Sequence, residues 1–135
     1  MSGKVESYRD LLVWQQAMEL AVSVYEATRA WPKEELYGLT SQVRRAATSV
    51  PANIAEGYGR ETRPSYEHFL RVAQGSLKEV ETHLLVAQRI GLDSKGKIDP
   101  LLTSSESVGK LLRLLLRRLA NERTAPTPNP DPMLP

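Results

Sequence analysis

Hydrophobic residues along the first part of the chain are spaced as in an amphipathic helix. From about Tyr8 to Ala30 they recur at steps of three and four, which places side chains on one helical face. We expect Trp31-Pro32 to end this helix, because the residue before a proline is disfavoured in the helical conformation. The predicted core-facing positions are Leu11, Trp14, Met18, Ala21, Val22 and Tyr25.

A second helix is predicted from about Glu34 to Tyr58, although Pro51 lies inside it. An interior proline removes a backbone hydrogen bond and costs about 3 kcal/mol or more, so close packing must fix the segment. Small residues around Pro51 would allow neighbouring helices to approach, which predicts that this helix is the hub of a bundle. The apolar face holds Leu36, Leu39, Val43, Val50 and Ile54, and the small residues are Ala46, Ala47, Ala52, Ala55 and Gly57.

The third predicted helix has the most regular apolar spacing. Thr62 is the expected N-cap, Pro64 lies in the first turn and Gly91 follows the last turn. A second apolar line at Phe69, Val72 and Ile90 predicts that the helix is covered on more than one side. We expect Gly75 to mark a close crossing against Ala52 or Ala55. The main apolar line is Tyr66, Leu70, Ala73, Leu77, Val80, Leu84 and Ala87.

The fourth helix is expected to begin with Asp99 as N-cap and Pro100 at the first helical position, and to run to Arg123. Residues 1–123 thus predict an all-α domain, an antiparallel up-down four-helix bundle. Residues 124–135 contain five prolines in twelve positions, which predicts a disordered or polyproline II tail. The apolar face of the fourth helix comprises Leu101, Val108, Leu112, Leu115 and Leu119, widened by Leu111 and Leu116.

Composition excludes several classes of protein. The 135 residues include no cysteine, which excludes disulfide frameworks, thiol catalysis and zinc sites built on cysteine. No apolar run is long enough for a transmembrane helix, and the first residues lack the apolar region of a signal peptide. We therefore expect a cytoplasmic protein with no membrane contact. The net charge is only +2, so the placement of the charges matters more than their sum.

Four strings carry a resemblance to a known family. They are LVWQQAMEL from Leu12, YGLTSQVRRAA from Tyr37, SVPANIAEGYGR from Ser49 and YEHFLRVAQGSLKEVETHL from Tyr66. Over about residues 8 to 120 the chain resembles the four-helix-bundle family of 23S rRNA intervening-sequence proteins. The resemblance implies a ring-shaped homopentamer with basic surface and no known enzymatic activity. That family is similar to the accessory variability protein of diversity-generating retroelements, which partners a reverse transcriptase and binds nucleic acid.

A basic stripe on the fourth predicted helix is the strongest candidate for a nucleic-acid contact. Lys110, Arg113 and Arg117 are spaced i, i+3 and i+7, and Arg118 lies beside them. No acidic residue interrupts residues 108–121. One interpretation is phosphate binding, reinforced by repetition around a ring. The other is a solvated face whose cations are favoured by the nearby helix C-terminus. Arg44 and Arg60 are second candidates for nucleic-acid contacts.

A polar stripe on the second predicted helix falls within about 80° of arc on an ideal helix. It could form a nucleic-acid or partner surface, or a satisfied polar network inside the bundle or between subunits. We favour the structural interpretation, because the alanines and glycines around the stripe are typical of packing. Glu56 and Arg60 are spaced to pair at i, i+4. The stripe consists of Arg45, Ser49, Asn53, Glu56 and Arg60.

No enzyme signature is present in the sequence. A di-iron bundle needs two Glu-x-x-His motifs on different helices, whereas His68 and His83 both lie on the third predicted helix. Hydrolase elbows, phosphate-binding glycine loops and metalloprotease motifs are missing. We therefore expect no enzymatic activity, metal or cofactor. The favoured function is phosphate-mediated binding of RNA or DNA. Two alternatives stay open: docking to a reverse transcriptase, and a structural assembly without a nucleic-acid ligand.

Overall fold

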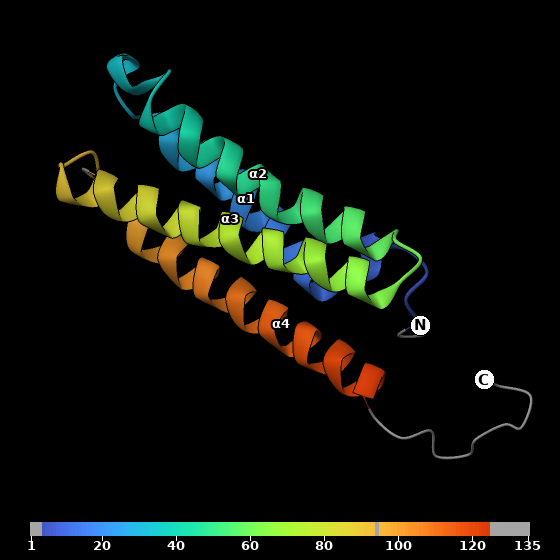
Figure 1. Cartoon of the computed structure of the whole chain (residues 1–135). Helices are drawn as coiled ribbons and strands as arrows, with labels where there is room; N and C mark the ends of the chain where they lie inside the picture. Colours follow the sequence, from blue (N-terminus) through green and yellow to red (C-terminus); the bar gives the residue numbers. More distant parts are fainter. Residues whose placement is uncertain (1–3, 94, 125–135) are drawn as a thin grey trace, which may run out of the picture.

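The computed structural model describes residues 4–93 and 95–124, and these form an all-helical bundle without a strand. The all-α prediction is thereby confirmed. Residues 125–135, most of the predicted proline-rich tail, lie outside the described residues. The helices are α1 (Leu12–Thr28), α2 (Leu39–Tyr58), α3 (Arg63–Arg89) and α4 (Ile98–Thr124), with 3-10 turns η1 (Tyr8–Asp10) and η2 (Lys33–Glu35) (Figure 1).

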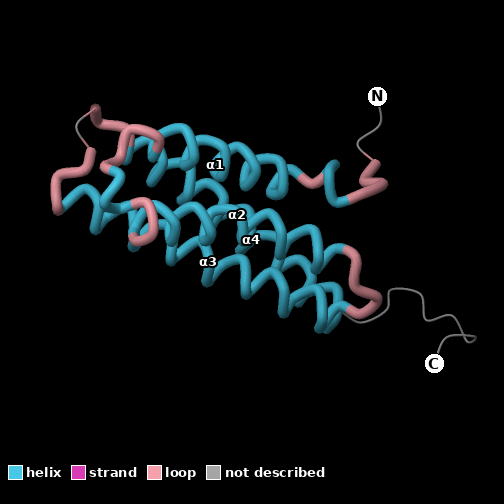
Figure 2. Tube along the Cα trace, turned by 90° about the horizontal axis from the view of Figure 1, so that it is seen from above, coloured by secondary structure: helices cyan, strands magenta, loops and turns pink. Residues whose placement is uncertain are grey.

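The four helices lie lengthwise beside one another, and sequence neighbours are neighbours in space. α2 packs most extensively against α3, α1 packs against α2, α3 packs against α4, and α1 contacts α4 to close the bundle. Figures 1 and 2 both place the start of α1 and the end of α4 at the same end of the bundle.

The first two helices begin later than the sequence pattern predicts. Ser7 and Asp10 form a reciprocal capping box at the start of η1, and Leu11, the residue after η1, is extended with φ −73° and ψ 126°. α1 therefore starts at Leu12 and not at Tyr8. Likewise, η2 ends at Glu35, and Gly38, with φ −111° and ψ −112°, precedes α2. Local capping and a glycine thus break periodic segments that looked continuous.

The ends of α3 match the prediction, whereas α4 begins two residues earlier than predicted, at Ile98 and not at Pro100. The Thr62 hydroxyl accepts a bond from the backbone N–H of Ser65 at 3.3 Å, and Gly91 has φ +83°. Before α4, the Asp93 carboxylate accepts the backbone N–H groups of Lys97 at 2.8 Å and Ile98 at 3.2 Å. Helix α4 consequently includes Ile98, and the predicted cap residue Asp99 lies inside its first turn.

One close helix crossing occurs at Gly57 and not at Gly75. A Cβ at Gly57 would lie 2.9 Å from the Cβ of Phe69 and 3.1 Å from a ring carbon of Tyr66. A Cβ at Gly75 would meet nothing within 4 Å, so the predicted crossing against Ala52 or Ala55 is wrong. Pro51 is buried inside an uninterrupted α2. That helix packs against α1 and α3 and so has two helical neighbours, like each of the other helices, and the prediction of a hub is not confirmed.

The core-facing side of α1 differs from the predicted one. Its buried hydrophobic residues are Val13, Ala17, Leu20, Ala21 and Val24. Met18, Val22 and Tyr25 are instead 39%, 52% and 40% exposed. Of the predicted positions, Ala21 is buried and Leu11 and Trp14 pack against the core, so the prediction is confirmed for these three and wrong for the three exposed residues.

The second apolar line of α3 is also uncovered within the described chain: Val72 is 39% and Ile90 57% exposed. None of the described helices combines the length and apolar character that a membrane span requires.

Candidate nucleic-acid interface

The basic stripe on α4 is on the surface of the bundle. Lys110, Arg113, Arg117 and Arg118 are all exposed, whereas the leucine face of the same helix is buried at Leu112, Leu116 and Leu119. Burial of the leucines anchors the helix, and the helical period then turns the cationic side chains outward.

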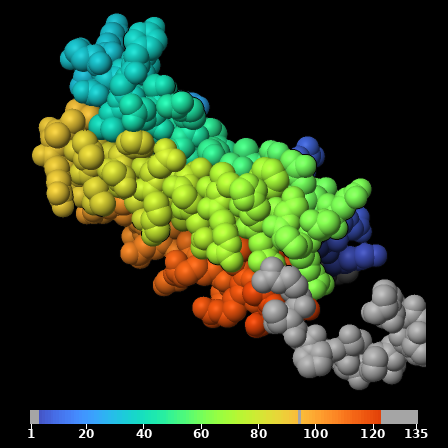
Figure 3. All heavy atoms as spheres, viewed as in Figure 1, coloured from blue at the N-terminus to red at the C-terminus, as the bar shows by residue number. Residues whose placement is uncertain are grey.

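Two neighbouring cations on α3 extend this surface across a groove. Arg71 and Lys78 line one side of the groove, and Arg113 of α4 lines the other. The groove encloses about 420 Å³, and its lining includes Gly75 of α3 and Gly109 of α4. Figure 3 shows this face, with α3 in yellow and green running beside α4 in orange. We call this feature the α3–α4 groove.

Arg113 extends back over its own helix toward the groove. One guanidinium nitrogen lies 3.5 Å from the position that a Cβ would take at Gly109, and a methyl carbon of Leu77 lies 3.4 Å from the same position. Gly109 is buried, so its lack of a side chain lets Leu77 and Arg113 approach the α4 backbone closely. Arginine is well suited to phosphate, because its planar fork can donate two parallel hydrogen bonds.

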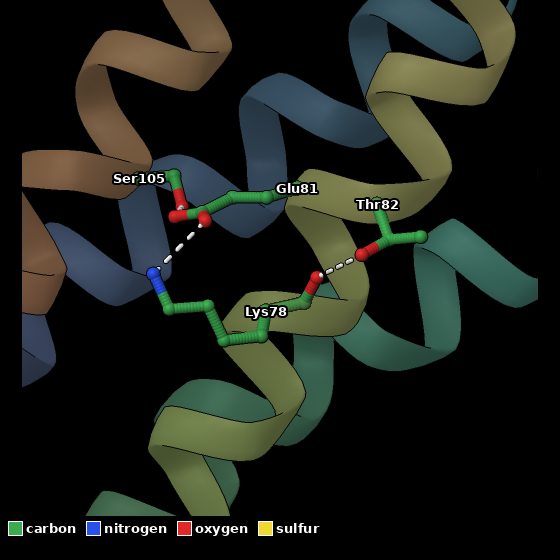
Figure 4. A network of polar contacts seen from close by, with 4 residues as sticks. All are labelled: Lys78, Glu81, Thr82 and Ser105. Carbon is green, nitrogen blue, oxygen red and sulfur yellow. Dashed lines mark hydrogen bonds and ion pairs between the residues drawn. The ribbon is translucent and has the colours of Figure 1, made fainter.

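Lys78 is positioned by a polar network that joins α3 to α4 (Figure 4). Its ammonium group pairs with Glu81 at 3.1 Å, and the fully buried Ser105 hydroxyl donates to the other carboxylate oxygen of Glu81 at 2.6 Å. The Lys78 side chain remains 70% exposed, whereas the Glu81 side chain is 20% exposed. The carboxylate thus orients the lysine while the lysine still faces solvent beside the groove.

The second-choice arginines lie elsewhere and are engaged within the fold. Arg44 donates to the Thr28 hydroxyl at 2.8 Å, and its guanidinium lies 4.8 Å from the ring centroid of Tyr25. Arg60 pairs with Glu56 at 2.7 Å, the spacing that the sequence predicted, and lies 4.5 Å from the ring centroid of Phe69. Neither residue lines the α3–α4 groove.

The polar stripe of α2 contains contacts within the bundle. The hydroxyl groups of Ser49 and Ser76 are 2.8 Å apart and join α2 to α3. The Asn53 amide donates to the Ser49 backbone carbonyl at 2.8 Å and to its hydroxyl at 2.9 Å. Arg45 is exposed. The observed contacts of Ser49 and Asn53 are those expected of a structural network.

Arg118 lies close enough to Tyr66 for its charge to act on that phenol. Burial, together with the nearby Tyr58, raises the pKa of Tyr66 from 10.0 to about 12, and the charge of Arg118 partly opposes this rise. The two tyrosine rings meet edge to face with centroids 6.1 Å apart. The end of the α4 stripe therefore lies next to the start of α3.

Sequence analysis did not single out Arg71, Lys78 or Gly109 as part of a site. A signal was present: Arg71 and Lys78 are spaced i, i+7 on α3, with the polar Gln74 between them at i+3. What the sequence could not supply was the pairing of this face with Arg113, because that depends on how α3 and α4 are rotated against each other. No aromatic residue lines the groove, so its chemistry favours phosphates over stacked bases.

Comparisons with known proteins agree with the fold. The profile of the family described as "23S rRNA-intervening sequence protein" matches residues 9–113, which include Arg71, Lys78 and Arg113 but not Arg117 or Arg118. A crystal structure from Bacteroides thetaiotaomicron, of a protein with unknown function from the S23 ribosomal protein family, is similar with a TM-score of 0.71. That similarity has 22% sequence identity and covers 78% of this chain and 99% of the other. No curated protein matches the chain.

Proposed function

Because this chain belongs to the 23S rRNA-intervening sequence protein family, as its sequence predicted, we propose that it is a non-enzymatic protein that binds RNA through phosphates. The family's printed name concerns ribosomal RNA, which makes structured RNA the first ligand to consider. DNA offers the same phosphate chemistry and is the comparison ligand in the test. The setting that we propose is the cytoplasm.

The observation that carries this proposal is the convergence of cations from two helices on one groove. Arg71 and Lys78 from α3 and Arg113 from α4 line a cavity that also contains two glycines. Among the described residues, the ion pairs involve Arg60, Arg63 and Lys78, so Arg71 and Arg113 are not neutralised by them. Phosphate contacts position a nucleic acid without selecting its sequence, so binding should tolerate changes of sequence.

We place this surface on a homopentameric ring of antiparallel up-down bundles. Val72, Val86 and Ile90 support self-association: they lie at i, i+14 and i+18 on one face of α3 and are 39%, 44% and 57% exposed. We call this face the α3 apolar stripe. A ring would repeat the modest charge of each groove and raise the local positive potential.

The direct test is fluorescence anisotropy with a structured rRNA fragment and a matched DNA duplex, titrated across salt concentrations. Counterion release predicts that log affinity for the duplex falls with log salt at a slope of about −0.9 per neutralised phosphate. Reversing two charges, Arg113→Glu with Arg117→Glu, should weaken binding to both ligands and make the slope shallower by about 1 for each lost contact.

The matched control reverses two exposed lysines at the opposite end of the bundle, Lys33→Glu with Lys95→Glu. It changes the net charge by the same amount and should leave most of the affinity and the slope intact. Equal losses in both double variants would show that only total charge matters and would overturn the assignment to the α3–α4 groove. Failure of the unmodified chain to bind either ligand at low salt would overturn the proposed function.

A further inference from the structure

An apolar groove between α1 and α2 is uncovered in the described chain. Its α1 wall includes Trp14, Met18, Val22 and Tyr25, with Glu26 beside them, and its α2 wall includes Pro51 and Ala52. The groove encloses about 520 Å³, and its exposed lining is mostly apolar. We call it the α1–α2 groove.

The shape and chemistry of the groove suit an extended, proline-rich peptide. Trp14 is fixed by an edge-to-face contact with Tyr8, whose ring centroid is 5.2 Å away. Tyr25 is held at the other end by the guanidinium of Arg44. Rigid aromatic walls are the usual feature of grooves that bind polyproline II segments, whose preformed shape loses little entropy on binding.

The chain itself contains a segment of this kind. Residues 130–135 read Pro-Asp-Pro-Met-Leu-Pro, with a single charge among six residues. We propose that the α1–α2 groove is the docking site for residues 130–135 of the same copy of the chain. The proline-rich segment would then cover the outer apolar face of α1.

Length and position are compatible with docking inside one copy. Helix α4 ends at Thr124, at the end of the bundle where α1 starts (Figure 1). α1 contacts both α4 and α2, so the segment has only one helix to pass. The path around half of a helix about 10–12 Å in diameter is about 16–19 Å long. Six steps from Thr124 to Pro130 would span about 19 Å at the polyproline II rise of about 3.1 Å per residue.

The groove also has the right length for the six remaining residues. Trp14 and Tyr25 are eleven residues apart on α1, a distance of about 16 Å along the axis. Six residues in the polyproline II conformation span about 19 Å. The apolar Met133 and Leu134 would then lie along the groove, where the side chains of Met18 and Val22 are exposed.

Trp14 provides the readout, because the chain has two tryptophans and Trp31→Phe leaves Trp14 alone. In this full-length background, replacing Met133 and Leu134 by serine should shift Trp14 emission to the red and increase its quenching by acrylamide. The matched control, Thr127→Ser with Asn129→Ser, changes the same segment outside the docked residues and should leave both signals unchanged.

A substitution in the α1–α2 groove itself tests the same contact. Val22→Lys should produce the same rise in quenching, whereas Leu85→Lys, which places the same charge at an exposed apolar position on α3, should not. Circular dichroism at 222 nm checks that each variant keeps its helices. Docking within one copy further requires that the quenching difference be independent of protein concentration.

Three results would overturn the inference. The first is identical Trp14 emission and quenching with and without the Met133 and Leu134 substitutions. The second is a dependence of the quenching difference on protein concentration, and the third is a fall in molecular mass caused by Val22→Lys. Either of the last two would assign the groove to a neighbouring copy.

Discussion

Two glycines inside helices lie in opposite environments: Gly57 is tightly packed, and Gly75 has open space around it. Gly57 is buried where α2 meets the first turns of α3, and any side chain would strike Phe69 and Tyr66. Gly75 is exposed on α3, with open space around the position of a Cβ. Packing within the chain therefore explains Gly57 and leaves Gly75 unexplained.

We expect Gly57→Ala to lower the free energy of unfolding by about 1–3 kcal/mol, because overpacking outweighs the better helix propensity of alanine. Gly75→Ala should instead raise it by up to about 1 kcal/mol, since propensity acts there without a clash. Urea unfolding followed by circular dichroism measures both values. Stabilisation by Gly57→Ala would contradict the close contact with Phe69.

The pKa of Tyr66 predicts how stability changes in alkali. Because the pKa is raised from 10.0 to about 12 in the folded state, the folded protein holds the phenolic proton more tightly than the unfolded chain. This contribution is fully present below pH 10 and is lost as the pH rises from about 10 to 12. The free energy of unfolding is measured for the unmodified chain and for Tyr66→Phe as the pH is raised. The unmodified value minus the Tyr66→Phe value should fall between about pH 10 and 12. A flat difference would contradict the raised pKa.

Capping explains which helix ends were predictable from sequence. Thr62 and Gly91 act as expected, because an isolated hydroxyl before a helix and a glycine after it have one plausible role each. The starts of α1, α2 and α4 were misplaced because Asp10, Glu35 and Asp93 bind nearby backbone N–H groups. Such bonds compete with the apolar period, and sequence spacing alone does not decide between them.

The contact between α3 and α4 depends on a buried hydroxyl that sequence analysis did not identify. We expect Ser105→Ala to lower the free energy of unfolding by about 1–3 kcal/mol, because Glu81 loses a charge-assisted hydrogen bond in a largely buried setting. The control is Thr82→Ala, which removes an exposed hydroxyl bonded only to the Lys78 carbonyl of its own helix. Thr82→Ala should change stability little. Equal effects of the two variants in urea unfolding would show that the Ser105–Glu81 bond is unimportant.

At the scale of the whole molecule, the four-helix bundle and its family were predictable because helical periodicity and the Ser49–Arg60 string are local features. The outward-facing apolar residues were harder to predict from the sequence. Met18, Val22 and Tyr25 were assigned to the core although they are exposed, because an outward apolar face has the same helical spacing as one that faces the core. The α3–α4 groove likewise joins residues that are far apart in sequence, so sequence analysis identified Arg113 but not Arg71 or Lys78.

The ring proposal makes a prediction about mass in solution. Light scattering should give about five times 15.1 kDa for the unmodified chain. Val86→Lys with Ile90→Lys should lower that mass, because two charges would be buried in the α3 apolar stripe. The control Leu36→Lys with Tyr37→Lys alters two exposed apolar residues in the connection before α2 and should leave the mass unchanged. An unmodified chain at 15.1 kDa, or an unchanged mass for the α3 variant, would contradict the proposed contact.

The connection of α2 to α3 through residues 59–62 has a consequence for how fast the protein folds. The most extensive helix pair forms between segments adjacent in the chain, so little loop-closure entropy opposes it. Helical bundles with such local contacts fold in about microseconds to milliseconds. We expect α2–α3 to form the folding nucleus and α1–α4, the pair most distant in sequence, to close last. Substitutions at Gly57 should then slow refolding, whereas substitutions between α1 and α4 should mainly accelerate unfolding.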